Sequence, residues 1–286
     1  MSLDVNAVFS EYLNTHLPRI NSFHPHFNEA LAWILNAGGK HFRAQLILGT
    51  MLAFSKKNKI NKSALKCALS VEFFHTYSLI HDDLPAMDNA AFRRGVQTLH
   101  LKYDQTTAIL VGDGLNTQAF YELSKIKKAK LSYKLIKILA YNGGLNGMVI
   151  GQAIDCYFEN KKLDLVKLKF LHLHKTACLI AGCMQMGAVL AKQNKKTQKS
   201  VYNLGLKLGL AFQIHDDIID ASASQSIAKK PVKNDKDKNS FTNLLGLQGA
   251  KNARDELKEQ ILNKASTQIK PLLNDLMQKY LKDSDV

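Results

Sequence analysis

Apolar residues recur at intervals of three and four along most of this chain, which is the spacing of one face of an α-helix. The segments 65–80 and 131–140 show this spacing most clearly. Alternation with a period of two, which marks a half-buried strand, is rare, and the run Leu171–His174 is too short to predict one. The pattern therefore predicts an all-α fold of about ten or more helices.

Short polar stretches interrupt the helical pattern and predict the connections between helices. They lie at residues 21–25, 56–62, 125–132, 160–164, 193–197 and 221–240. Only the last stretch is long, and helical spacing resumes directly after it, so we interpret it as a mobile loop rather than a linker between domains. With 286 residues, 46% of them hydrophobic, the chain can bury a large core. We expect one domain over residues 1–286.

Three features bear on where the protein works. The longest uncharged apolar stretch, Thr176–Ala191, is shorter than the roughly 20 residues that span a bilayer. The first residues, Met1–Asp4, show no basic region followed by an apolar run. The four cysteines, at positions 67, 156, 178 and 183, form no CxxC pair, which fits buried thiols in a reducing compartment. We expect a cytoplasmic protein without membrane insertion.

Basic residues outnumber acidic ones, with 39 Lys and Arg against 24 Asp and Glu, which gives a formal net charge of +15. Much of the excess lies in residues 125–137 and 161–169, where nearly all the basic residues are lysines at predicted helix ends and loops. A basic surface for nucleic acid is one interpretation. Solvated lysine faces are the simpler one, and we expect no nucleic-acid partner.

One five-residue motif occurs twice in the chain: Ile80-His81-Asp82-Asp83-Leu84 recurs as Ile214-His215-Asp216-Asp217-Ile218. A third aspartate follows each pair, Asp88 in the first copy and Asp220 in the second. On a helix, residues four apart share a face, so the second copy presents two carboxylates about one turn apart. In the first copy Pro85 should bend or end the helix and so bring the third aspartate back.

Aspartates crowded at the C-terminal end of a helix repel one another and oppose the helix dipole, so a cation should compensate them. Oxygen ligands that leave room for water and a phosphate are typical of a Mg²⁺ site. A single such cluster is more simply an exposed helix end paired with lysines. Two matched clusters on apolar helices favour metal binding.

Basic residues stand near both aspartate clusters. Gly38-Gly39-Lys40-His41-Phe42-Arg43 occupies a predicted helix junction, where glycines let a ligand approach the backbone. Arg93-Arg94 follows the first cluster, and Lys175-Thr176 opens the uncharged helix. Guanidinium and ammonium groups are what diphosphate oxygens require. Together with the acidic clusters, they indicate a polyanion that is bound through metal.

These motifs resemble a known family. Val71–Asp88, followed by Arg93-Arg94-Gly95, closely resembles the first aspartate-rich motif of bacterial short-chain trans-isoprenyl diphosphate synthases, and Phe212–Asp220 resembles the second. Three shorter matches occur in the family's order and at similar spacing: Gly-Gly-Lys-x-x-Arg at residues 38–43, Gly151–Asp155 and His174–Thr176. The likeness covers roughly residues 38–246 and is strongest to the farnesyl diphosphate synthases of the family.

The resemblance implies an isoprenoid synthase fold, a helical barrel or bundle around a central cavity, in a homodimer. It implies a Mg²⁺-dependent prenyltransferase that joins isopentenyl diphosphate head-to-tail to dimethylallyl and geranyl diphosphate, giving (2E,6E)-farnesyl diphosphate and diphosphate. Several Mg²⁺ ions in each active site are implied, for which Mn²⁺ can substitute. The same chemistry ending at geranyl or geranylgeranyl diphosphate is the alternative.

The resemblance also implies roles for individual residues. The metal ligands would be Asp82, Asp88, Asp216 and Asp220, accompanied by the catalytic aspartates Asp83 and Asp217. The allylic diphosphate would be held by Arg93, Lys175 and Lys238, with Lys230 of the same polar loop as a further candidate. Isopentenyl diphosphate would be bound by Lys40, Arg43, His75 and Arg94. Thr176 and Gln213 would face the developing allylic cation.

Chain length is expected to depend on the helix before the first motif. An allylic tail anchored near Asp82 must extend back along this helix, past Ser78, which lies one turn away. In the resembling family, an aromatic residue at the position of Tyr77, together with an insertion like Pro85-Ala86, accompanies a C15 product. We therefore expect Tyr77 to close the tail pocket; the simpler alternative is an ordinary core aromatic.

Two other classes of function compete with this reading. An HD-type metal phosphohydrolase also carries His-Asp pairs, but His81 and His215 point about 100° away from the following aspartates on a helix. Structural roles for these histidines are simpler. A basic helical module for nucleic acid would not explain two aspartate clusters, which repel phosphates unless a metal intervenes.

Overall fold

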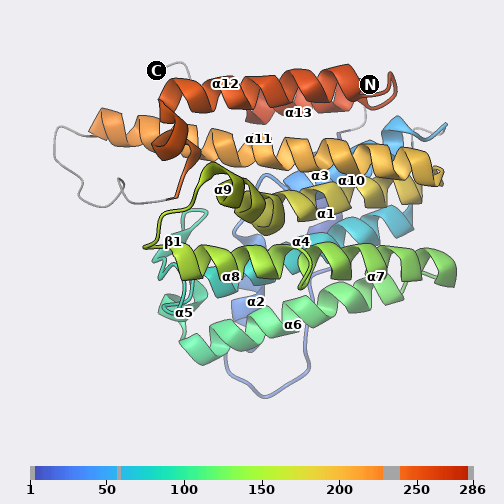
Figure 1. Cartoon of the computed structure of the whole chain (residues 1–286). Coiled ribbons are helices and arrows are strands. Elements are labelled where there is room, and N and C mark those ends of the chain that lie inside the picture. The colour runs from blue at the N-terminus through green and yellow to red at the C-terminus, as the bar shows by residue number, and fades with distance from the viewer. Residues whose placement is uncertain (1–3, 57–58, 228–238, 283–286) are drawn as a thin grey trace. The chain divides into compact units, whose positions relative to one another are not determined.

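The structure, a computed structural model, describes residues 4–56, 59–227 and 239–282 (Figure 1). The first half contains α1 (Val5–Thr15), α2 (Phe27–Asn36), α3 (Phe42–Ala53), α4 (Lys62–Asp82), the strands β1 (Phe92–Arg93) and β2 (Val96–Gln97), α5 (Leu99–Lys102), α6 (Gln105–Ser124) and α7 (Ala129–Gly143). The second half contains α8 (Met148–Phe158), α9 (Leu165–His172), the π-helix η1 (Leu173–Ala177), α10 (Cys178–Leu190), α11 (Lys195–Ile227), α12 (Phe241–Lys264) and α13 (Lys270–Tyr280). The predicted all-α class is confirmed.

The chain divides into two compact units. Unit 1 comprises Met1–Leu52 and Lys56–Ile136, and unit 2 comprises Ala53–Ser55 and Lys137–Val286. Unit 1 carries the first aspartate motif and unit 2 the second. The single domain expected from the sequence stays a prediction.

Unit 1 is organised around the packing of α4 on α6. Asn61 caps α4 by accepting a hydrogen bond from the backbone N–H of Ala64 at 3.0 Å. Most of α4 is buried on several sides, because its residues from Cys67 to Phe74 are apolar or small with few exceptions. Ser70 donates a hydrogen bond to the backbone oxygen of Ala119 on α6 at 2.7 Å and so ties the two helices together.

Unit 2 contains the end of α7 and the helices α8 to α13, and α11 lies beside α12 and α10 (Figure 1). One of its apolar clusters joins the connection before α9 to α9, α11 and α12: it contains Leu163, Leu168, Leu171, Ile214, Ile218, Phe241 and Ala250. Ile214 and Ile218 flank the aspartates of the second motif on α11. Their burial fixes which face of α11 is left for the carboxylates.

The structure shortens three predicted connections and adds three elements. Within the predicted connections 125–132 and 193–197, α7 already begins at Ala129 and α11 at Lys195. The stretch 221–240 was expected to be a loop throughout, but α11 continues to Ile227, because helical hydrogen bonding extends past the last apolar repeat. Residues 228–238 lie outside the described part of the chain, and Lys230 and Lys238 lie among them. The strands β1 and β2, which pair antiparallel, and the π-helix η1 are too short for a periodic sequence signal.

One helical segment, Leu165–Leu190, is long and apolar enough to cross a membrane by length and composition alone. It consists of α9, η1 and α10. Within its most apolar window 72% of the residues are buried inside the protein, as in the core helix of a globular fold. The segment is therefore weak support for a membrane span.

Candidate active site

The first aspartate motif lies where α4 ends. The helix stops at Asp82, and Pro85 stands in the turn that follows. The backbone N–H of Asp88 donates to the backbone oxygen of Asp82 at 2.9 Å, so the chain folds back on the helix end. Asn89 adopts a positive φ of 47°, which asparagine tolerates better than most residues. The expected return of Asp88 after the proline is thus confirmed.

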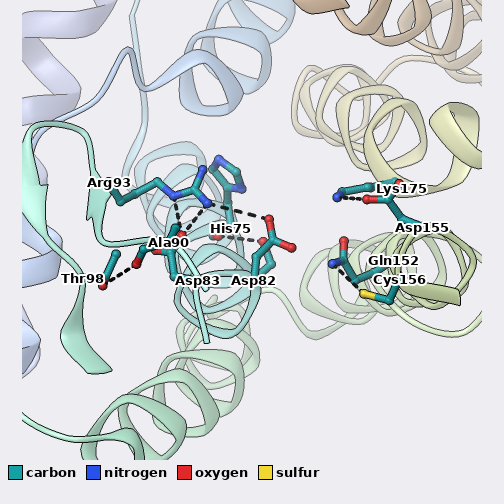
Figure 2. A network of polar contacts seen from close by, with 11 residues as sticks. His75, Asp82, Asp83, Ala90, Arg93, Thr98, Gln152, Asp155, Cys156 and Lys175 are labelled. Atoms are coloured by element: carbon teal, nitrogen blue, oxygen red, sulfur yellow. Dashed lines mark hydrogen bonds and ion pairs between the residues drawn. The ribbon is translucent and has the colours of Figure 1, made fainter. Parts of the chain in front are cut away.

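The middle aspartate of this motif faces into the protein. Asp83 is 2% exposed and accepts hydrogen bonds from Nε and Nη2 of Arg93 at 2.8 and 2.5 Å (Figure 2). Burial raises the pKa of Asp83, and the Arg93 guanidinium offsets part of that rise. Asp82 is half-buried, with an oxygen 3.8 Å from Nη2 of Arg93, and Asp88 is exposed. Asp83 therefore orients Arg93, while the two flanking aspartates remain on the outer side.

The glycine-rich loop of unit 1 is held by Arg94. Its Nη1 donates to the backbone oxygen of Gly38 at 2.7 Å, and its guanidinium lies directly against Gly39, where a Cβ atom would come within 3.0 Å of Cζ. Gly39 also has a φ of 149°, which L side chains rarely adopt, so a larger residue there would strain the backbone and crowd Arg94. The loop ends with exposed Lys40 and half-buried Arg43 in the first turn of α3.

His75, on α4, faces the same arginines. Its pKa is held well below its ordinary value of 6.5, first by burial and then by the charges of Arg43, Arg94 and Arg93. A neutral imidazole beside three guanidinium groups leaves a strongly positive region in unit 1. Such a region suits the oxygens of a diphosphate. The structure thus brings His75 close to Arg43 and Arg94, the residues expected beside it, and also to Arg93, which was expected to bind the other diphosphate.

Tyr77 and Ser78 follow on α4, between His75 and the aspartates. Tyr77 is buried, with its ring centroid 4.8 Å from that of Phe74 and 5.5 Å from that of His81. Burial raises its pKa, and Asp113 raises it further. Ser78 is half-buried and donates to the backbone oxygen of His75 at 2.8 Å. Tyr77 is therefore a fixed bulky group one turn and a half before Asp82.

The second aspartate motif lies on α11 in unit 2. Asp216 and Asp220 are exposed and one helical turn apart, as predicted. Asp217 accepts a hydrogen bond at 2.7 Å from the backbone N–H of Phe241, the first residue of α12. A carboxylate is favourable there, because the N-terminus of a helix carries partial positive charge. Asp217 therefore anchors α12, and the two flanking aspartates project outward.

Thr176 and Gln213 meet, as the sequence analysis expected of residues facing one substrate. The hydroxyl of Thr176 donates to Oε1 of Gln213 at 2.8 Å, and Nε2 of Gln213 donates to Oδ2 of Asp216 at 3.1 Å. Nδ1 of His172 lies 3.3 Å from the same Oε1 and must donate, because an amide oxygen only accepts. This network fixes the orientation of the Gln213 amide.

Lys175 is presented by the π-helix η1. Its Nζ lies 2.5 Å from Oδ2 of Asp155 on α8 (Figure 2). Gly151, one turn before Asp155, allows the contact, because a Cβ atom there would come within 2.0 Å of the backbone nitrogen of Lys175. Single-turn π-helices inside longer helices are frequent at functional sites. One residue further along α8 in each case, Nε2 of Gln152 donates to Sγ of Cys156 at 3.4 Å.

The donor chemistry fits a hard divalent cation that shares its ligands with a substrate. Within residues 4–56, 59–227 and 239–282, no group of three or more His, Cys, Asp or Glu side chains is placed to hold a metal alone. Each motif offers two outward carboxylates, Asp82 with Asp88 and Asp216 with Asp220. Mg²⁺ is commonly bound by one or two carboxylates, with water and phosphate oxygens completing the shell.

Comparisons with known proteins agree with this arrangement. The polyprenyl synthetase family matches residues 24–277. The chain belongs to the polyprenyl synthetase family. It is 38% identical to the farnesyl diphosphate synthase of Micrococcus luteus over 87% of this chain and 86% of that protein. It is also 36% identical to the geranylgeranyl diphosphate synthase of Cyanophora paradoxa, over 80% of this chain and 76% of that protein.

Solved structures of the family are similar over nearly the whole chain. The crystal structure of geranyltransferase from Helicobacter pylori complexed with magnesium and isoprenyl diphosphate matches with a TM-score of 0.87. The sequence identity is 42%, and the match covers 98% of this chain and 96% of that one.

Four residues of this polyprenyl synthetase have positions that the sequence analysis did not assign. Asp155 pairs with Lys175, His172 contacts Gln213, buried Arg254 donates to Nδ1 of His215, and Glu72 binds the first turn of α3. Asp155 and Glu72 lie inside the matched segments Gly151–Asp155 and Val71–Asp88, which is the signal that could have found them. His172 and Arg254 carry no local signal, because their partners lie far away in the sequence.

Proposed function

We propose that this polyprenyl synthetase is a farnesyl diphosphate synthase. It would condense isopentenyl diphosphate with dimethylallyl diphosphate and then with geranyl diphosphate, releasing diphosphate at each step. The observation that carries the proposal is the end of α4, where two outward carboxylates adjoin a cluster of arginines around neutral His75. The farnesyl diphosphate synthases among the relatives support the choice of product; the geranylgeranyl diphosphate synthase is compatible with a longer one.

A divalent metal is a requirement of the family, and we propose that here it is Mg²⁺, several ions per site, with Mn²⁺ as a substitute. Asp82 and Asp88 of unit 1, and Asp216 and Asp220 of unit 2, would hold it. When bound, the metal neutralises the charge that develops on the departing diphosphate. Asp83 would act through Arg93, and Asp217 through the position of α12.

The two diphosphates would use different cations. Arg93 and Lys175 would bind the allylic diphosphate, with Lys238 and Lys230 as further candidates from outside the described residues. Lys40, Arg43, His75 and Arg94 would bind isopentenyl diphosphate. Neutral His75 would donate a hydrogen bond without adding charge to the three arginines.

The reaction breaks the allylic C–O bond, and the electron pair leaves with the diphosphate oxygen. Arg93 and Lys175 stabilise that oxygen as charge develops on it. Thr176 and Gln213 would face the allylic cation, with the Thr176 hydroxyl held in place by the hydrogen bond that it donates to Gln213. The double bond of isopentenyl diphosphate attacks, a C–C bond forms, and a proton passes from the new product to the released diphosphate. Exclusion of water protects the cation meanwhile.

Three finer points belong to the same proposal. Tyr77 would close the tail pocket at C15, the protein would act as a homodimer, and it would work in the cytoplasm as a single-domain enzyme. Tyr77 supports the first point, because it is buried and fixed by two neighbouring rings. Light scattering of the purified protein measures the oligomeric state directly.

The test is incubation of the purified protein with radiolabelled isopentenyl diphosphate and dimethylallyl or geranyl diphosphate, with Mg²⁺ or with EDTA. We expect a Mg²⁺-dependent C15 product by chromatography against prenyl standards. A main product of C10 or C20 would instead indicate a geranyl or geranylgeranyl diphosphate synthase. No condensation with any of these substrates, combined with hydrolysis of a phosphomonoester, would favour the phosphohydrolase instead.

A further inference from the structure

Glu72 is a buried carboxylate beside the cationic cluster of unit 1, and no step of the reaction above uses it. It lies on α4, one turn before His75, and is 5% exposed. Acidic side chains are almost never so buried unless they are paired. Its partners therefore indicate what the carboxylate does.

The first oxygen of Glu72 holds the start of α3. Oε1 accepts a hydrogen bond from the backbone N–H of Ala44 at 3.1 Å. Ala44 is the third residue of α3, and N–H groups in the first turn of a helix have no partner within the helix. The carboxylate also meets the positive end of the helix dipole. Glu72 therefore sets the position of the turn that carries Arg43.

The second oxygen of Glu72 faces the glycine-rich loop. Oε2 lies 3.5 Å from Nδ1 of His41, which has a positive φ of 45° and joins the loop to α3. The same carboxylate acts on Arg94: burial lowers the pKa of Arg94, and the negative charge of Glu72 opposes that effect. Arg94 in turn binds Gly38 and lies against Gly39.

One buried side chain thus contacts or attracts each part that presents the cations for isopentenyl diphosphate. We propose that Glu72 is a positioning residue that holds the loop 38–41 and the first turn of α3 in the geometry that binds the diphosphate of isopentenyl diphosphate. The proposal rests on the proposed function of this cluster. Glu72 does not touch the substrate itself; it acts through Arg43, His41 and Arg94.

Two variants and one control separate this role from simple stability. Glu72→Ala removes both oxygens, whereas Glu72→Gln keeps the volume and an acceptor for Ala44 but removes the charge. Glu122→Gln is the matched control, because Glu122 is also a buried carboxylate of unit 1, 7% exposed, and is bonded to Gln118 and Lys125 on its own helix and just beyond it. Glu122 belongs to neither cation set.

Three measurements are made on the full chain. The affinity for inorganic diphosphate is measured by calorimetry in EDTA, so that only the protein's cations bind the probe. Amide hydrogen exchange is followed by mass spectrometry in peptides covering residues 38–46. Steady-state kinetics give KM separately for isopentenyl and geranyl diphosphate.

For Glu72→Ala we expect diphosphate affinity to fall and the KM for isopentenyl diphosphate to rise by about 10- to 100-fold, the usual effect of losing a charged hydrogen bond. The KM for geranyl diphosphate should stay within about twofold, and exchange in residues 38–46 should be faster. For Glu72→Gln, the diphosphate affinity, the KM for isopentenyl diphosphate and the exchange rate should lie between those of Glu72→Ala and wild type. If Glu72→Ala does not fold, these values for Glu72→Gln test the positioning role. Glu122→Gln should leave all three measurements unchanged.

Unchanged exchange in residues 38–46 together with unchanged diphosphate affinity would overturn the proposal. A parallel change in both KM values that merely follows the loss of thermal stability would also overturn it, since that is a structural effect. If Lys40→Ala leaves the KM for isopentenyl diphosphate unchanged, the proposed substrate of the cluster fails. In that case, the hydrogen exchange of residues 38–46 and the affinity for inorganic diphosphate still test whether Glu72 positions the cluster.

Discussion

His172 should make the stability of this protein depend on pH in a way that one substitution removes. Its side chain is buried, stacks on Phe241 with ring centroids 5.5 Å apart, and has its pKa lowered from 6.5 to about 4. Burial is the main cause, because the charged imidazolium would lose its hydration. In the folded chain His172 therefore stays neutral at pH values below 6.5 at which it is already protonated in the unfolded chain.

The sign and size of the effect follow from this difference. Above pH 6.5 both states hold a neutral histidine, so stability is complete; as pH falls towards 4, only the unfolded state gains a proton and stability is lost. One pKa unit corresponds to about 1.4 kcal/mol. At pH 4.5, His172 should therefore lower the free energy of unfolding by roughly 2 kcal/mol relative to pH 7.

The assay is reversible urea unfolding of wild type and His172→Asn at pH 7 and pH 4.5. Asparagine can keep the hydrogen bond to Gln213 but does not titrate. We expect the variant to be less stable at pH 7 by about 1–2 kcal/mol, through lost packing, and to match wild type at pH 4.5. As a control, His16→Asn replaces an exposed histidine. It should change the free energy of unfolding by less than about 0.5 kcal/mol relative to wild type at either pH. A constant loss for His172→Asn at both pH values would refute the reasoning.

Further variants test the proposed roles. Asp82→Ala or Asp216→Ala should lower kcat by about 10²–10³ or more while circular dichroism stays native; near-wild-type rates in both would exclude these residues as metal ligands. Lys40→Ala should chiefly raise the KM for isopentenyl diphosphate and Lys175→Ala should chiefly lower kcat, whereas the reverse pattern would mean that the subsites are exchanged. Tyr77→Ala should extend the products to C20 or longer on chromatography, and a variant still stopping at C15 would place the closure elsewhere.

The sequence predicts the features of this fold that depend on local chemistry. Apolar spacing defines the helices, and Pro85 predicts the fold-back that brings Asp88 to Asp82. Each of these signals lies within a few residues of the feature that it determines. The spacing of Asp216 and Asp220 on one face of α11 is local in the same way.

The features that the sequence does not predict depend on distant partners. Glu72 reads as one polar residue in an apolar helix, and only the approach of α3, 28 residues earlier, gives its carboxylate a role. Likewise, Asp155 meets Lys175 because η1 widens one turn and Gly151 admits its backbone. No periodicity encodes such a contact, since a single turn of π-helix leaves the apolar spacing of the segment nearly unchanged.

The three aspartates of each motif are arranged in the same way, although the two motifs lie in different units. In each, the first and third aspartates project outward, and the second is used inside the protein. Asp83 holds Arg93, and Asp217 holds the start of α12. Asp83 thus positions a cation, and Asp217 positions a helix. The second aspartate of each Asp-Asp pair is therefore best understood as an anchor for a neighbouring segment of its own unit.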